Sequence, residues 1–140
     1  MTESSAHAPS AYETKAWLQY YPEWTKPHLD YGDKTLLDSY QETVETYGDR
    51  PATWFFGHQM TYRELDTHVR AAAAGLKAFG IRPGDRVAVA LPNCPQHVAV
   101  FYAILKLGAT VVEHNPLYTA PELEPLFKDH AARVAVVWDK

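Results

Sequence analysis

Apolar residues recur at helical spacing in two stretches of the first half of the chain. Between residues 36 and 47 they place Leu37, Tyr40, Val44 and Tyr47 on one helical face, and Gly48 follows as a stop. In the second stretch Thr61 and Glu64 have the spacing of a capping box, and Gly80 marks the end. The pattern predicts an amphipathic helix of about five turns with the apolar face Tyr62, Leu65, Val69, Ala72, Leu76 and Phe79.

A run of β-forming residues lies between these two helices. Residues 53–56 and 59–61 flank the dipeptide Gly57-His58, and Pro51 precedes them. Short strand-forming runs on either side of a glycine-containing turn are typical of a β-hairpin. We therefore expect a hairpin before the long helix.

The second half of the chain alternates short apolar runs with helical patterns. Short continuous apolar runs are typical of strands that are buried on both faces. We expect Asn93 to cap a helix whose middle, Val98–Leu105, is apolar nearly all round, and a later helix to begin between Pro121 and Glu124. The expected strands cover residues 87–91, 110–112 and 134–138. The order predicts an α/β fold, a parallel βαβαβ sheet flanked by helices, preceded by the first helix and the hairpin.

The N-terminal third has a different composition. Residues 1–11 are small and polar without periodicity, and we expect them to be disordered. Residues 12–33 form an aromatic-rich segment interrupted by Pro22 and Pro27, which favours extended or briefly helical structure. Its rings need a partner, and packing along the domain surface is favoured over a membrane interface because the segment carries no net positive charge. Residues 34–140 are expected to form the folded domain.

Charge and composition exclude several functions. The formal net charge is -4 and no run of Lys and Arg is present, so nucleic acid and anionic membrane are poor partners. The longest apolar runs are far shorter than the roughly 20 residues of a membrane span, and residues 1–10 do not resemble a secretory signal. A single cysteine fits a cytoplasmic location, with at most peripheral membrane contact.

Ligands of a parallel α/β sheet bind at the carboxyl ends of its strands, here residues 91–93, residues 113–115 and the chain beyond Trp138. Cys94 and His97 have the spacing of a nucleophile and base at a helix start, but a small apolar residue followed by a packed histidine is the stronger interpretation. Glu113-His114 could contact a substrate, although a histidine satisfied by the backbone is again favoured.

The sequence contains no recognisable phosphate-binding or metal-binding motif. The glycines are never closer than four residues, and neither G-x-G-x-x-G nor G-K-[ST] occurs. The seven histidines form no H-x-x-x-H or H-E-x-x-H pair. We therefore assign no catalytic, cofactor-binding or metal-binding residue.

The layout also predicts a truncated domain. A helix that is apolar around its circumference needs neighbours on more than one side, and the sequence stops two residues after the last expected strand, without a helix to cover it. We expect further chain to follow.

Four blocks of sequence resemble the acyl-adenylate-forming, or AMP-binding, enzymes. Residues 60–65 (MTYREL) resemble the first core motif, L-T-Y-x-E-L, and residues 101–112 (FYAILKLGATVV) resemble the second. Residues 84–88 (GDRVA) and 91–93 (LPN) stand between them in the family's order. The flanks 17–22 (WLQYYP) and 115–123 (NPLYTAPEL) resemble bacterial long-chain fatty acid–CoA ligases. Departures from the pattern are Leu107 and the pair Glu113-His114.

The resemblance implies a two-step reaction. A fatty acid carboxylate attacks ATP, with Mg²⁺ present, to give acyl-adenylate and diphosphate, and coenzyme A then displaces AMP. The family's phosphate loop and catalytic lysine have no matching position in residues 1–140, so the resemblance implies an inactive N-terminal fragment, the first part of the AMP-binding domain, that binds none of these cofactors alone. Thr61 and Gly108 are interpreted as structural, and Tyr62 and Lys106 as non-catalytic.

Two alternatives about partners stay open. The chain could instead be a stand-alone, non-catalytic binding or dimerisation module derived from such a ligase. The aromatic segment could also meet a second subunit and form a homodimer. Otherwise the expected partners are the fatty acid, ATP, coenzyme A and the remainder of the same chain.

Overall fold

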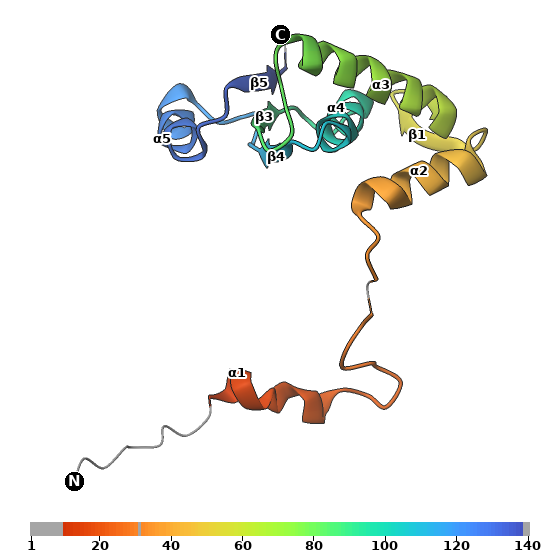
Figure 1. Ribbon diagram of the computed structural model, residues 1–140, viewed down its shortest axis with the longest axis vertical. Coiled ribbons are helices and arrows are strands. Elements are labelled where there is room, and N and C mark those ends of the chain that lie inside the picture. Colours follow the sequence, from red (N-terminus) through yellow and green to blue (C-terminus); the bar gives the residue numbers. More distant parts are fainter. Residues whose placement is uncertain (1–9, 31, 139–140) are drawn as a thin grey trace. The chain divides into compact units, whose positions relative to one another are not determined.

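A computed structural model describes residues 10–30 and 32–138 of the 140-residue chain (Figure 1). The chain divides into two compact units, residues 1–34 and 35–140, and each is described by itself. Most of the segment expected to be disordered, residues 1–11, lies outside the described residues.

The N-terminal unit contains two short helical pieces. Helix α1 spans Ala11–Thr14, and the 3-10 helix η1 spans Ala16–Tyr20. Lys15 joins them in a left-handed conformation with a φ of 49°. Brief helices in an aromatic segment agree with the prediction. Within this unit Tyr12, Tyr20 and Trp24 are more than 80% exposed, and packing of the segment along the domain surface stays a prediction.

The second unit begins with helix α2 (Leu36–Tyr47) and a hairpin of strands β1 (Pro51–Phe55) and β2 (His58–Thr61). The bounds of α2 are those the sequence predicts. Strands β1 and β2 pair antiparallel, with Phe55 opposite His58. The two turn residues, Phe56 and Gly57, both have positive φ, 46° and 83°, as expected of the tight turn that follows the right-handed strand twist.

Helix α3 (Tyr62–Ala78) follows the hairpin directly. The Thr61 side chain accepts from the backbone N–H of Glu64, and the Glu64 carboxylate accepts from the Thr61 N–H at 2.8 Å, which confirms the predicted capping box. Leu65, Val69 and Leu76 are buried as predicted, whereas Phe79 is 78% exposed. Phe79 is the C-cap residue, so it lies beyond the regular helical face.

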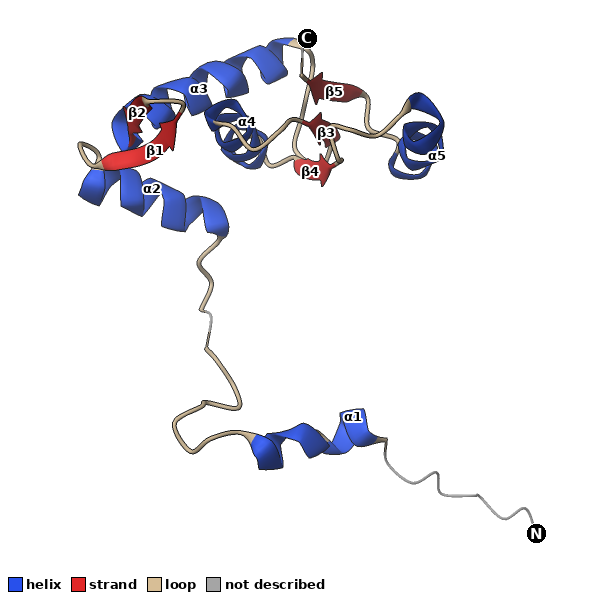
Figure 2. Cartoon of the chain, turned by 180° about the vertical axis from the view of Figure 1, so that it is seen from behind, coloured by secondary structure: helices blue, strands red, loops and turns tan. Residues whose placement is uncertain are grey.

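Three parallel strands form the sheet of the second unit in the order β4-β3-β5. Strand β3 (Arg86–Ala90) is central, with β4 (Thr110–Glu113) and β5 (Val134–Val137) as its neighbours. Helix α4 (Pro95–Lys106) connects β3 to β4, and α5 (Ala120–His130) connects β4 to β5. Figures 1 and 2 show α4 and α5 on opposite faces of the sheet. The predicted α/β architecture is therefore confirmed, with strand ends shifted by about one residue.

The hydrophobic core lies between the sheet and helices α2, α3 and α4. Val87 and Val89 of β3 and Ile104 of α4 are completely buried, as expected for a central strand and for a helix that packs on more than one side. Tyr40 of α2 stacks on Tyr102 of α4 with ring centroids 4.0 Å apart. Helix α5, in contrast, contains no fully buried residue.

Two short connections fix how the strands meet the helices. Cys94, rather than the predicted Asn93, is the N-cap of α4, and its side chain makes no capping hydrogen bond. Pro95 at the first turn starts the helix instead, since its fixed φ suits that position. At the other end Gly108 adopts a φ of 67°, and a Cβ there would approach the Cβ of Pro83 to 3.3 Å. The predicted tight turn at Gly108 is confirmed.

Candidate functional site

The carboxyl ends of the three parallel strands meet at one edge of the sheet. After β3 the chain passes through Leu91 to Asn93 into α4, and β4 ends with Glu113. Strand β5 ends with Val137, and Trp138 follows it, 53% exposed. This is the edge at which the sequence predicts a ligand.

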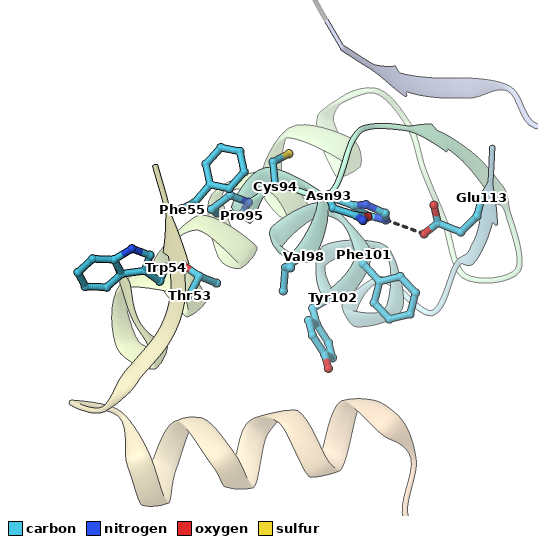
Figure 3. Close-up of a pocket in the computed structure, with 11 residues that line it drawn as sticks. Thr53, Trp54, Phe55, Asn93, Cys94, Pro95, Val98, Phe101, Tyr102 and Glu113 are labelled. Carbon is cyan, nitrogen blue, oxygen red and sulfur yellow. Dashed lines mark hydrogen bonds and ion pairs between the residues drawn. The ribbon is translucent and has the colours of Figure 1, made fainter. Parts of the chain in front are cut away.

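A cavity of about 590 Å³ opens beside this edge, between the hairpin and α4 (Figure 3). Strand β1 contributes two aromatic side chains and a threonine, α4 contributes apolar and aromatic side chains, and β4 contributes Glu113 from the far side. The lining residues are Thr53, Trp54, Phe55, Asn93, Cys94, Pro95, His97, Val98, Phe101, Tyr102 and Glu113.

A histidine–carboxylate pair supplies the polar end of this cavity. The Nε2 atom of His97 lies 2.9 Å from Oε1 of Glu113, the contact drawn dashed in Figure 3. The two side chains are 23% and 45% exposed, so water screens the pair on one side. The parallel register places Glu113 opposite Val89 of β3, and the first turn of α4 returns His97 over the same strand end.

Cys94 and His97 are brought to the same cavity but are not paired through their side chains. Cys94 is a free, half-buried thiol, and the His97 ring is engaged by the Glu113 carboxylate instead. What joins the two residues is the backbone hydrogen bond from His97 N–H to the Cys94 carbonyl. The described geometry therefore favours a packed helix start over a nucleophile and base.

A second hollow, of about 780 Å³, lies over the ends of β3 and β5. It shares Phe55, Asn93 and Cys94 with the first cavity. Most of its remaining lining is aliphatic or aromatic, with one amide from α4: Phe56, Leu91, Pro92, Gln96, Val100, Val136, Val137 and Trp138. Together the two hollows present a largely apolar surface along the carboxyl edge of the sheet.

The side chains of Glu113 and His114 point to opposite faces of the sheet, although the two residues form one candidate pair in the sequence. Successive residues of a strand point to opposite faces, and His114 is buried among α5 side chains. Its Nε2 atom lies 3.0 Å from Nε2 of His130. Burial, and secondarily His130, lowers the pKa of His114 below its ordinary value. A backbone partner, the interpretation favoured from sequence, is replaced here by a second histidine.

Sequence reasoning missed the hairpin as a wall of the site. The Trp54-Phe55-Phe56 run was the available signal, because three consecutive aromatic residues in a two-stranded hairpin cannot all face one core. Phe101 and Tyr102 of α4 also line the cavity.

No cluster of three or more potential metal ligands occurs among residues 10–30 and 32–138. In the same described ranges, the helices are too short or too polar for one to cross a bilayer. What the described side chains offer is an apolar hollow of ligand size with one histidine–carboxylate pair at its rim.

Fold and cavity together define a class: an α/β domain with helices on both faces of a parallel sheet and a hollow at the carboxyl edge. A family model described as AMP-binding enzyme matches residues 40–140. The chain belongs to the AMP-binding enzyme family.

Individual relatives agree with this assignment. The chain is 38% identical over 125 residues to a long-chain-fatty-acid–CoA ligase of Bacillus subtilis, a match covering 89% of this chain and 22% of the relative. It is 40% identical over 80 residues to 4-coumarate–CoA ligase 4 of Arabidopsis thaliana, covering 57% and 14%. The chain thus spans about a fifth of the length of the long-chain ligases it matches.

Solved structures show the same fold. The N-terminal subdomain of NpsA from Klebsiella oxytoca superposes with a TM-score of 0.70 at 28% identity, covering 74% of this chain and 27% of that one. The inhibitor-bound N-terminal domain of FACL13 from Mycobacterium tuberculosis gives the same TM-score, identity and coverage.

Proposed function

We propose that the protein containing this chain is a long-chain fatty acid–CoA ligase. It would convert ATP, a fatty acid and coenzyme A into acyl-CoA, AMP and diphosphate through an acyl-adenylate, with Mg²⁺ as the metal. The supporting observation is the 38% identity to a long-chain-fatty-acid–CoA ligase over 89% of this chain, within the AMP-binding enzyme family. A cytoplasmic location, expected from the single cysteine, is part of the same proposal.

Within that ligase, residues 1–140 would supply framework rather than chemistry. Stabilisation of developing phosphoryl charge needs aimed backbone N–H groups, cations or metal ions. The sequence contains no glycine-rich phosphate loop, and the described cavity is lined mainly by apolar and aromatic side chains. We infer that the 140-residue chain alone does not form an acyl-adenylate.

The reading frame that encodes the chain provides the test. Its whole product, purified and given ATP, Mg²⁺, palmitate and coenzyme A, should release AMP and consume free thiol in equal amounts. Omission of palmitate is the matched control and should abolish both. A product that forms no thioester with saturated acids from eight to eighteen carbons would contradict the proposal.

The sequence of the reading frame beyond Lys140 distinguishes the ligase from the alternative, a stand-alone, non-catalytic module. A reading frame that stops at Lys140 would favour such a module. A frame that continues into a T-S-G-T-T-G-x-P-K-G-like loop would favour the ligase, since such a loop supplies the missing phosphate contacts.

A homodimer contact through the aromatic segment 12–33 belongs to the proposal. Tyr12, Tyr20 and Trp24 are each more than 80% exposed, and exposed aromatic rings are the side chains most enriched at protein interfaces. Sedimentation velocity of the protein with and without residues 1–33 tests it. A dimer that persists after the deletion would contradict the contact, whereas flotation of the intact protein with anionic vesicles would favour peripheral membrane binding instead.

A further inference from the structure

Glu113, the last residue of strand β4, and His114, which follows it, bind helices on opposite faces of the sheet. Glu113 reaches His97 of α4 at 2.9 Å. His114 reaches His130 of α5 at 3.0 Å. Figures 1 and 2 show the two helices on either side of the sheet. The end of β4 therefore connects the two helical layers through two histidine contacts.

The hydrogen bonds around His130 fix where the protons are in the histidine pair. The backbone N–H of Ala132 donates to Nδ1 of His130 at 3.0 Å. Because a backbone amide can only donate, Nδ1 of His130 carries no proton, and the proton of the neutral ring is on Nε2. That Nε2–H then donates to Nε2 of His114, so His114 carries its own proton on Nδ1.

Neither ring can take up a second proton without losing a hydrogen bond. A proton on Nδ1 of His130 would face the N–H of Ala132, and a proton on Nε2 of His114 would face the N–H of His130. The same reasoning disfavours a metal ion bound by both Nε2 atoms. Each neutral ring would then carry its proton on Nδ1, and the Nδ1–H of His130 would face the backbone N–H of Ala132.

The surroundings of the pair also favour the neutral rings. His114 is 9% exposed and stacks on Phe127 with ring centroids 5.2 Å apart. From β3, the Arg86 guanidinium donates to the His130 carbonyl at 3.2 Å, which adds a positive charge near the pair. Glu113 of β4 acts in the opposite sense and raises the His114 pKa, but its effect is smaller than those of burial and of His130, and its carboxylate contacts His97. On α5, Lys128 pairs with Glu124.

We propose that the His114–His130 pair is an acid-labile latch that holds α5 against the sheet when both rings are neutral and releases it when either is protonated. Apart from this pair, the Phe127 stack and the Arg86 contact, the described structure gives α5 little fixation, since the helix has no fully buried residue.

The other contact at this strand end belongs to the candidate site, because Glu113 and His97 both line the cavity.

The pH direction follows from the His114 pKa. Burial, then the neighbouring His130, lowers this pKa below the ordinary value of 6.5. A base with a lowered pKa binds fewer protons folded than unfolded, so its contribution to stability is complete above about pH 6.5 and is lost as the pH falls through the lowered pKa.

Imidazole nitrogen shifts of the 140-residue chain test the proton assignment without any substitution. At pH 7.5, two-bond ¹H–¹⁵N spectra should show the Nε2–H form for His130 and the Nδ1–H form for His114. Finding His130 in the Nδ1–H form, or either ring charged at that pH, would overturn the proposal. So would a shift of both Nε2 resonances on addition of one equivalent of Zn²⁺.

Amide hydrogen exchange tests the release. Between pH 7.5 and 5.0, protection factors in α5, corrected for intrinsic exchange, should fall about tenfold relative to those in α3, the factor expected for one lost hydrogen bond. In the double variant His114→Phe/His130→Phe that fall should disappear, and in the control His58→Gln, an exposed histidine of β2, it should persist. An unchanged ratio, an α5 unprotected at pH 7.5, or the same fall in the double variant would each contradict the latch.

Discussion

Gly48, which follows α2, is required by space rather than by backbone conformation. Its φ of -48° is open to any residue. A Cβ at this position, however, would lie 2.8 Å from the Val44 carbonyl oxygen and 2.8 Å from Nη2 of Arg63. Arg63 can move, since its side chain is 63% exposed, but the carbonyl belongs to the backbone of α2. A glycine is thus required at this helix end by a steric contact that the sequence pattern does not reveal.

Gly48→Ala should lower the free energy of unfolding by roughly 1–3 kcal/mol, the usual range for overpacking. Gly75→Ala is the matched control, because a Cβ inside α3 at that position meets nothing within 4 Å. It should raise the free energy of unfolding by about 0.5–1 kcal/mol through better helix propensity. Urea denaturation measures both, and equal effects of the two substitutions would contradict the steric explanation.

The ring of Tyr40 packs in the core and buries the hydroxyl group with it. The hydroxyl is buried and has no hydrogen-bond partner among the described residues, while the ring stacks on Tyr102. Burial, with smaller contributions led by Asp66, raises the pKa of Tyr40 to about 12.

Tyr40→Phe keeps the ring and removes the orphaned hydroxyl, so the free energy of unfolding should stay the same or rise by up to about 1 kcal/mol. Tyr47→Phe, at a ring that is 46% exposed, is the control and should change little. A loss of more than about 1 kcal/mol for Tyr40→Phe would mean that the hydroxyl has a partner, such as a buried water. Thermal denaturation at neutral pH distinguishes these outcomes.

At the scale of elements, one local device starts three of the helices. The residue before α2, α3 and α5 is a threonine whose N–H donates to an acidic side chain three positions later, at 2.8, 2.8 and 2.7 Å. These pairs are Thr35 with Asp38, Thr61 with Glu64, and Thr119 with Glu122. Because the hydrogen bonds span three residues, such starts can be predicted from sequence alone.

Thr61→Ala should lower the free energy of unfolding by about 1 kcal/mol, the usual cost of removing an N-cap side chain. Thr61→Ser retains the hydroxyl and should change little. Hydrogen bonds from the Thr61 backbone and then its side chain lower the pKa of Glu64 below 4.5. The stabilisation by Glu64 is therefore present above pH 4.5 and lost in more acid solution. Because Thr61→Ala removes the side-chain part of this interaction and keeps the backbone part, the difference between wild type and variant should become smaller as the pH falls through the lowered pKa, without vanishing. A constant difference would contradict this cause.

The boundary that the sequence misplaced has a different cause. Asn93 has the better capping side chain, yet Cys94 is the N-cap, because the residue before a proline is disfavoured in helical conformation and Cys94 is extended, with φ -144° and ψ 164°. The exposure of Phe79 is a similar case: periodicity extends one residue past the end of α3, where the chain has already left the helix. Local spacing predicted the order and type of the elements, and their ends depended on backbone restrictions of single residues.

At the scale of the whole molecule, the candidate site arises from contacts that no local pattern encodes. His97 and Glu113 meet because β3 and β4 lie in parallel register, which returns the chain over the same edge after one helix. The sequence predicted that edge but not the pairing. The aromatic run of the hairpin indicated that some rings face away from the core, but that Trp54 and Phe55 line this cavity depends on the packing of the hairpin beside α3.

We propose that these 140 residues are the framework of an AMP-binding ligase and do not perform its first step alone. ATP–pyrophosphate exchange by the purified 140-residue chain, with Mg²⁺ and palmitate, tests this proposal, and the whole product of the reading frame serves as the comparison. We expect exchange by the whole product and no exchange above the protein-free background by the 140-residue chain. Palmitate-dependent exchange by the 140-residue chain would show that the chain is more than a framework.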